Sequence, residues 1–152
     1  MKTIPMMCKT ACNKVAGGRL PYHYDLNIYR GCGHQCRYCF ALYTHAYLND
    51  LAYYDHIYVK TNIAERLEEL LSCRNWKQDV INLGGITDSY QPIEEEYQIM
   101  PDILKLLIRY KTPAILSTKS DLILRDHDLI ARLAEITYVN VAATITTVRE
   151  DI

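Results

Sequence analysis

Residues 30–40 place three cysteines in one short, glycine-containing segment, Arg-Gly-Cys-Gly-His-Gln-Cys-Arg-Tyr-Cys-Phe. Cys32, Cys36 and Cys39 follow the spacing Cys-x-x-x-Cys-x-x-Cys, which lets three thiolates reach one metal centre. Because the segment itself offers only these three cysteines, a four-coordinate metal or an iron–sulfur cluster bound here would keep one position open to another molecule. That open position is the strongest functional indication in the chain.

A structural zinc site and a chance grouping of cysteines are the two alternatives to a cluster at this segment. A structural zinc site usually shows paired Cys-x-x-Cys motifs or added histidines, and His34 is the one histidine available within the segment. We favour a cluster because a fourth ligand from His34 would close the site. Outside the segment, Cys8 and Cys12 could share one helical face and form a second metal site, but packed thiols are the simpler interpretation.

Composition sets the limits for any function. With 152 residues, of which 49% are hydrophobic, the chain can bury one ordinary core. The 17 Lys and Arg nearly balance the 18 Asp and Glu, so no overall basic field favours non-specific nucleic-acid binding. No apolar run is long enough for a signal peptide or a membrane span, so we expect a cytoplasmic protein whose six cysteines are thiols or metal ligands.

The order of the chain predicts strands alternating with helices. We expect residues 1–22 to be an irregular arm, because Gly17, Gly18 and Pro21 interrupt any period. Residues 23–152 are expected to begin the core domain. The predicted strands cover residues 24–30, 56–60, 79–83, 113–118 and 138–145. One predicted helix covers residues 40–48, and a second begins at the capping-box spacing of Asn62 and Glu65. A third has Pro101 in its first turn, and a fourth follows Asp126.

The last predicted helix start suggests that the domain continues. Thr147 and Glu150 repeat the capping-box spacing, yet the sequence ends at Ile152 after barely one turn. Strands joined by helices imply parallel, right-handed crossovers. We therefore predict an α/β fold, an incomplete (β/α) barrel truncated after about four β/α units, with the domain extending beyond residue 152.

Polar groups gather at the predicted carboxyl ends of these strands, where parallel α/β sheets bind ligands. The cysteine segment follows the first strand, and Gly84-Gly85 with Thr87 and Asp88 follows a later one. Residues 117–119 and 144–147 end two more strands. We expect these groups to share one opening that suits a polar, carboxylate-bearing cofactor.

The cysteine spacing, with Tyr38 before the last cysteine, resembles the radical S-adenosylmethionine (SAM) superfamily. Further segments are similar to its spore photoproduct lyase-like group, often called DNA repair photolyases. These segments are Asn27-Ile-Tyr-Arg-Gly-Cys32, Cys36-Arg-Tyr-Cys-Phe-Ala41, Val59-Lys-Thr-Asn62, Gly85-Ile-Thr-Asp-Ser-Tyr-Gln-Pro-Ile-Glu94, Thr118-Lys-Ser120 and Arg125-Asp126.

The resemblance implies a 4Fe-4S cluster on the three cysteines, with its fourth iron chelated by the amino and carboxylate groups of SAM. Reduction of the cluster would cleave SAM to a 5′-deoxyadenosyl radical, and the electron would come from a flavodoxin- or ferredoxin-type donor. The cofactor contacts implied by resemblance are the backbone at Tyr38, Gly84 and Gly85, Lys119, and either Thr144 or Thr146.

The resemblance does not identify a catalytic residue or a substrate, and nucleic acid stays open as a partner. Spore photoproduct lyase has a hydrogen-donating cysteine where this chain has Ile86, which argues against cleavage of a spore-type thymine dimer by that route. Two alternatives to a radical SAM lyase-like enzyme remain. One is a non-catalytic metal or iron–sulfur module, and the other is an inactive portion of such an enzyme.

Overall fold

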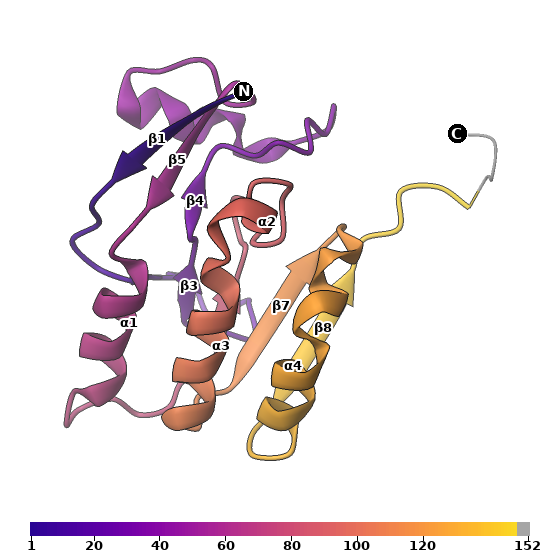
Figure 1. Cartoon of the computed structure of the whole chain (residues 1–152). Coiled ribbons are helices and arrows are strands. Elements are labelled where there is room, and N and C mark those ends of the chain that lie inside the picture. The colour runs from indigo at the N-terminus through magenta and orange to yellow at the C-terminus, as the bar shows by residue number, and fades with distance from the viewer. Residues whose placement is uncertain (149–152) are drawn as a thin grey trace.

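The computed structural model describes residues 1–148 and shows a mixed α/β chain with two sheets (Figure 1). The smaller sheet has three strands in the order β1-β5-β4, formed by Lys2–Met6, His56–Lys60 and Tyr29–Arg30. Strand β5 pairs in parallel with β1 and antiparallel with β4. This sheet lies on the side of the molecule that carries the cysteine segment (Figure 1).

The larger sheet has five strands in the order β2-β3-β6-β7-β8. Strands β3, β6, β7 and β8 all run in one direction, as predicted, while β2 adds an antiparallel edge. The predicted strand over residues 56–60 does not join this series, because β5 lies in the smaller sheet and pairs antiparallel with β4. The two sheets do not close into a barrel within residues 1–148. The five strands are Cys12–Lys14, Tyr24–Leu26, Ile81–Leu83, Ala114–Thr118 and Val139–Ala143.

Three amphipathic helices, α1 (Ile63–Ser72), α3 (Ile99–Arg109) and α4 (His127–Ala134), lie on one face of this sheet (Figure 1). Their inward side chains are fully buried, as for Leu67 and Leu107, and belong to the same apolar cluster as the strand residues. Burying each such side chain stabilises the fold by about 1.5–3 kcal/mol. The opposite face of the sheet is left free of these helices.

The prediction that residues 1–22 form an irregular arm is wrong, because the segment contains both β1 and β2. Strand β1 adds to the edge of β5, and Gly17 and Gly18 take positive φ values in the connection between β2 and β3. Such edge strands are short and half-exposed, so their apolar pattern is weak. These strands form by pairing with β5 and β3, which the local sequence does not indicate.

The strand predicted over residues 24–30 is divided between the two sheets as β3 and β4. Leu26, Ile28 and Tyr29 are all fully buried. A continuous strand would send Ile28 and Tyr29 to opposite faces. The chain instead changes sheets near residue 27, so both side chains reach the core.

The helix predictions hold for α1, α3 and α4 but differ in detail. Residues Phe40–Leu48 form a 3-10 helix, η1, and two short helices were not predicted, α2 (Glu94–Tyr97) and η2 (Asp121–Asp126). Asn62 and Asp126 precede helices without capping them through their side chains. The predicted helix start at Thr147 and Glu150 lies partly outside the described residues. No helix within residues 1–148 is long and apolar enough to cross a membrane.

A buried carboxylate connects α2 to its surroundings. Glu94 is fully buried and accepts hydrogen bonds from the Tyr29 hydroxyl at 2.5 Å and the Met100 amide at 2.9 Å. The Arg125 guanidinium donates to it at 2.9 Å. This arrangement satisfies amides at the start of α3 and pairs the buried charge.

We expect Glu94→Ala to lower the free energy of unfolding by about 3–5 kcal/mol, because it leaves the Tyr29 hydroxyl and the Met100 amide without their acceptor and removes one of the two carboxylates that pair with Arg125. Urea denaturation followed by circular dichroism measures the change. Glu95→Ala, one residue along on the exposed surface, is the matched control. Equal stability of the two variants would contradict this account of Glu94.

Candidate functional site

The three cysteines line one pocket at the ends of the parallel strands, with a volume of about 170 Å³. A cavity needs only about 10–15 Å³ by the same measure to admit one water molecule, so this one has room for a larger group. The pocket brings together the segments that the sequence placed at one opening. Its lining includes Cys32, Cys36, Cys39, Gly84, Gly85, Thr87, Asp88, Ser117, Thr118, Lys119 and Thr144.

Tyr38 and Thr146 are not among the residues that line this pocket. The Tyr38 side chain is 66% exposed and is not among the lining residues, so any contact there would have to come from its backbone. Thr146 is also exposed and outside the lining, whereas Thr144 is part of it. The structure therefore distinguishes between the two threonines by position.

Cys32 is the most enclosed of the three thiols. Burial raises its pKa, and backbone hydrogen bonding from Asp88 and His34 opposes that rise. Cys36 and Cys39 are only partly buried. Among the described residues, no three Cys, His, Asp or Glu side chains stand in a ready metal-binding arrangement. The segment would therefore have to close around a bound metal.

The turn after β6 approaches the cysteine segment through backbone atoms. Gly84 has φ +90°, and a Cβ there would lie 2.9 Å from the Thr87 carbonyl oxygen. A Cβ on Gly85 would overlap the Asp25 carboxylate. Because only glycine fits both positions without strain, the turn can present its peptide groups directly to a ligand.

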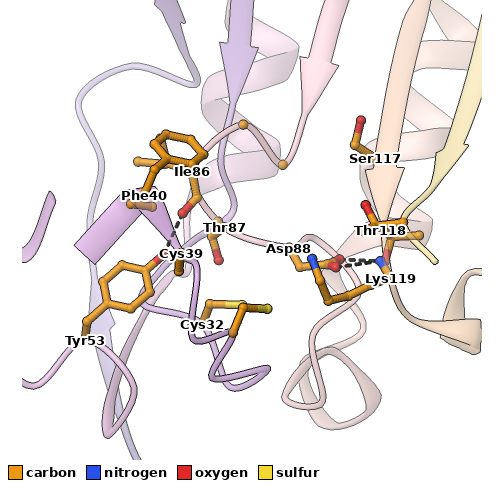
Figure 2. Close-up of a pocket in the computed structure, with 15 residues that line it drawn as sticks. Cys32, Cys39, Phe40, Tyr53, Ile86, Thr87, Asp88, Ser117, Thr118 and Lys119 are labelled. Carbon is orange, nitrogen blue, oxygen red and sulfur yellow. Dashed lines mark hydrogen bonds between the residues drawn. The ribbon is translucent and has the colours of Figure 1, made fainter. Parts of the chain in front are cut away.

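Asp88 connects this turn to the end of β7. Its carboxylate accepts hydrogen bonds from Thr118 Oγ1 at 2.7 Å and from the Lys119 amide at 3.0 Å (Figure 2). His34 Nε2 lies 3.2 Å from Asp88 Oδ2, the oxygen that also accepts from the Lys119 amide. Burial alone would raise the pKa of Asp88, but these hydrogen bonds outweigh it and hold the pKa below its ordinary value.

On the side of the pocket opposite Asp88, two tyrosines hydrogen-bond to backbone carbonyl groups. The Tyr53 hydroxyl donates to the Ile86 carbonyl at 2.6 Å, and the Tyr54 hydroxyl donates to the Cys36 carbonyl at 2.7 Å. Figure 2 shows the labelled cysteines between the Tyr53 and Phe40 rings on one side and Asp88 with Lys119 on the other. The pocket thus has an aromatic wall and a polar wall.

The donor set fits an iron–sulfur cluster. Cys32, Cys36 and Cys39 are free thiols in one cavity, and thiolates are the ligands that such clusters prefer.

A second cavity of about 490 Å³ adjoins this pocket on the helix-free face of the larger sheet. It shares Phe40, Gly84, Gly85 and Ser117 with the first, so the two are continuous. The sequence pattern did not predict this cavity, because its strand residues come together only through the register of three strands. Asn82 pairs with Ile115, and Ile115 pairs with Asn140. All its lining side chains are uncharged.

The remaining cysteines lie apart from the site. Cys8 is held by Asn62, whose Oδ1 accepts from the Cys8 amide at 2.8 Å and whose Nδ2 donates to the Cys8 carbonyl at 3.0 Å. Burial raises the pKa of Cys12 to about 12. Cys73 is exposed. Since Cys8 and Cys12 pack against the main core, the interpretation of packed thiols is consistent with the structure.

We expect Cys12 to react with iodoacetamide at pH 8 at least about a hundredfold more slowly than Cys73. A pKa near 12 leaves roughly one thiol in ten thousand ionised at that pH, and burial limits access further. Mass spectrometry of peptides after timed labelling measures both rates in one sample. Both sites should react fast in urea, and a fast Cys12 in the folded protein would contradict the buried-thiol account.

Comparison with known proteins gives relatives but no activity. The chain is 42% identical over 144 residues to uncharacterized proteins of Mycobacterium tuberculosis (strain H37Rv) and Mycobacterium bovis, covering 92% of this chain and 42% of each relative. An uncharacterized protein of Methanocaldococcus jannaschii is 33% identical over 113 residues, with 74% and 41% covered. The chain therefore spans about two-fifths of the length of these relatives. No family model and no solved structure matches it.

Proposed function

We propose that this chain forms the first part of the core of a radical SAM iron–sulfur enzyme, similar to the spore photoproduct lyase-like group. One observation carries the proposal: the three cysteines share a pocket with Gly84, Gly85, Lys119 and Thr144, which come from the ends of parallel strands. Parallel α/β sheets bind ligands at that edge. A structural zinc site would have no need of such an adjoining, partly open cavity.

The residues of the chain have separate roles in this proposal. Cys32, Cys36 and Cys39 hold the cluster, and the peptide groups at Gly84 and Gly85 bind the cofactor's amino group. Lys119 lines the pocket, and its ammonium makes no ion pair within residues 1–148, so it is available for a carboxylate. When bound, a reduced cluster supplies the electron that cleaves the sulfonium of SAM.

Tyr53 forms part of one wall of the same pocket. Its ring is almost fully buried, and its hydroxyl donates to the Ile86 carbonyl. The adjoining uncharged cavity supplies a place for the substrate beside the cofactor.

The reaction beyond cofactor cleavage departs from that of spore photoproduct lyase. Ile86 stands where that enzyme has its hydrogen-donating cysteine, and the main chain at Ile86 is held by Tyr53 and Asn27. Cys8, Cys12 and Cys73 do not line the pocket. We therefore propose a lyase-like radical enzyme with a different hydrogen donor, in a reducing cytoplasmic setting, served by a flavodoxin- or ferredoxin-type electron donor.

Anaerobic reconstitution tests the proposal. With iron, sulfide and a reductant, the wild-type protein should become brown and release 5′-deoxyadenosine from SAM, as measured by chromatography. Cys36→Ala should lose this product, because two cysteines cannot hold the cluster with one iron open. A four-iron wild-type protein that releases no more product than Cys36→Ala would overturn the enzymatic proposal.

Lys119→Met tests the cofactor contact separately. The substitution keeps most of the chain length and removes the charge, so we expect the Kd for SAM to rise about ten- to a hundredfold, the equivalent of one charge-assisted hydrogen bond. Iron content should stay at the wild-type level. Lys105→Met, on the exposed surface of α3, is the matched control. An unchanged Kd would remove Lys119 from the cofactor site.

A further inference from the structure

Gln91 is a fully buried amide whose contacts surround the first cysteine. Its Oε1 accepts a hydrogen bond from the Gly33 amide at 2.8 Å, and its Nε2 donates to the Gly31 carbonyl at 3.2 Å. Gly31 and Gly33 are the residues immediately before and after Cys32. One side chain therefore holds the backbone on both sides of this cysteine.

A second donor strengthens the same anchor. Thr87 Oγ1 donates to the Gly31 carbonyl at 2.8 Å and accepts from Gln91 Nε2 at 3.0 Å. The Gly31 carbonyl thus receives two hydrogen bonds from the segment that follows β6. Gly31, Thr87 and Gln91 are all buried, so removing one of these groups would leave its partner without a hydrogen bond in the interior, which is costly.

The other two cysteines are held less firmly. Cys36 and Cys39 are partly exposed, and within residues 1–148 the side chain that bonds their backbone is Tyr54, whose hydroxyl donates to the Cys36 carbonyl. The three thiols do not form a ready metal site within the described residues. Metal binding therefore requires residues 34–39 to move toward a cysteine that is already in place.

We propose that Gln91 is a positioning residue for the cysteine centre, which fixes Cys32 before the metal binds so that only the later part of the segment has to be ordered. The inference rests on the proposed function, because it assumes that the three cysteines bind one centre. Holding one ligand in advance lowers the ordering cost of binding. Partners behind metal ligands typically contribute 10–100-fold to metal affinity.

A structural role alone predicts a different behaviour. Glu94 lies three residues after Gln91 and is equally buried, but its partners are Tyr29, Arg125 and the start of α3. Substituting Glu94 should weaken the fold without reaching the backbone beside Cys32. Comparing a Gln91 variant with a Glu94 variant therefore separates a loss of fold stability from a loss of Cys32 positioning.

The test is a titration with Co²⁺ alone, under anaerobic reducing conditions, followed by the thiolate-to-cobalt absorption band. A Cys32→Ser variant gives the background from the other cysteines. We expect Gln91→Met to bind Co²⁺ about 10–100-fold more weakly than the wild type. Glu94→Gln, as the stability control, and Gln98→Met, the same change at an exposed site, should keep the wild-type affinity.

Hydrogen exchange gives a measurement without metal. The Gly33 amide should exchange faster in Gln91→Met than in Glu94→Gln, because only the former removes its acceptor. If Gln91→Met does not fold, Gln91→Glu replaces it. The carboxylate keeps the acceptor for Gly33 but loses the donor to Gly31, and an intermediate Co²⁺ affinity is expected.

The outcomes separate this inference from the proposed function. Wild-type Co²⁺ affinity in the folded Gln91 variant, or a loss no greater than in Glu94→Gln, overturns the role of Gln91. Identical cobalt spectra for wild type and Cys32→Ser overturn both the cysteine centre and this inference. Weakened binding in Gln91→Met together with no SAM cleavage by the wild type supports Gln91 and rejects only the enzyme.

Discussion

Three buried hydrogen-bonding side chains on the segment after β6 hold the site together. Asp88, Gln91 and Glu94 follow one another at intervals of three residues, and each is turned to a different part of the molecule. Asp88 binds the end of β7, Gln91 binds the cysteine segment, and Glu94 binds Arg125 and the start of α3. Because such groups are costly to leave unpaired in the interior, the segment specifies how these parts meet.

The second attachment of this segment involves its backbone. The Ile86 amide donates to Asn27 Oδ1 at 3.0 Å, and the Ile86 carbonyl accepts from Tyr53. Asn27 is itself fixed, since its carbonyl accepts from the buried Lys60 ammonium. Burial lowers the pKa of Lys60, yet this hydrogen bond keeps the amine partnered. The main chain at Ile86 is therefore held by two other segments, the link between β3 and β4 and the loop before β5.

Sequence periodicity predicted the parts of the fold that depend on local pattern. The helices α1, α3 and α4 and the strands β5 and β7 lie close to their predicted bounds, because their apolar faces repeat with a clear period. The shared edge of the cysteines with Gly84, Gly85 and Lys119 also followed from strand order alone. The roles proposed for these residues are still predictions.

What the sequence did not reveal depends on distant partners. Asn62 has the spacing of a capping residue, but its side chain binds the backbone of Cys8, 54 residues away. Gln91 was one polar residue among several in a turn, and its contacts with Gly31 and Gly33 span 60 and 58 residues. Local propensity contains no information on such pairs, so only the folded chain identifies them.

Long-range side-chain hydrogen bonds matter for the pocket because the two sheets do not close into a barrel within residues 1–148. In a closed barrel, strand pairing around the ring fixes every loop at the mouth relative to the others. Within residues 1–148 the strands β1, β5 and β4 form a separate sheet from β3, β6, β7 and β8. The cysteine segment leaves from the first sheet, whereas Gly84, Gly85 and Lys119 leave from the second. The pocket between them is therefore shaped by side-chain hydrogen bonds, chiefly those of Gln91, Thr87 and Asp88, which hold the backbone beside Cys32 and the end of β7 to the segment after β6.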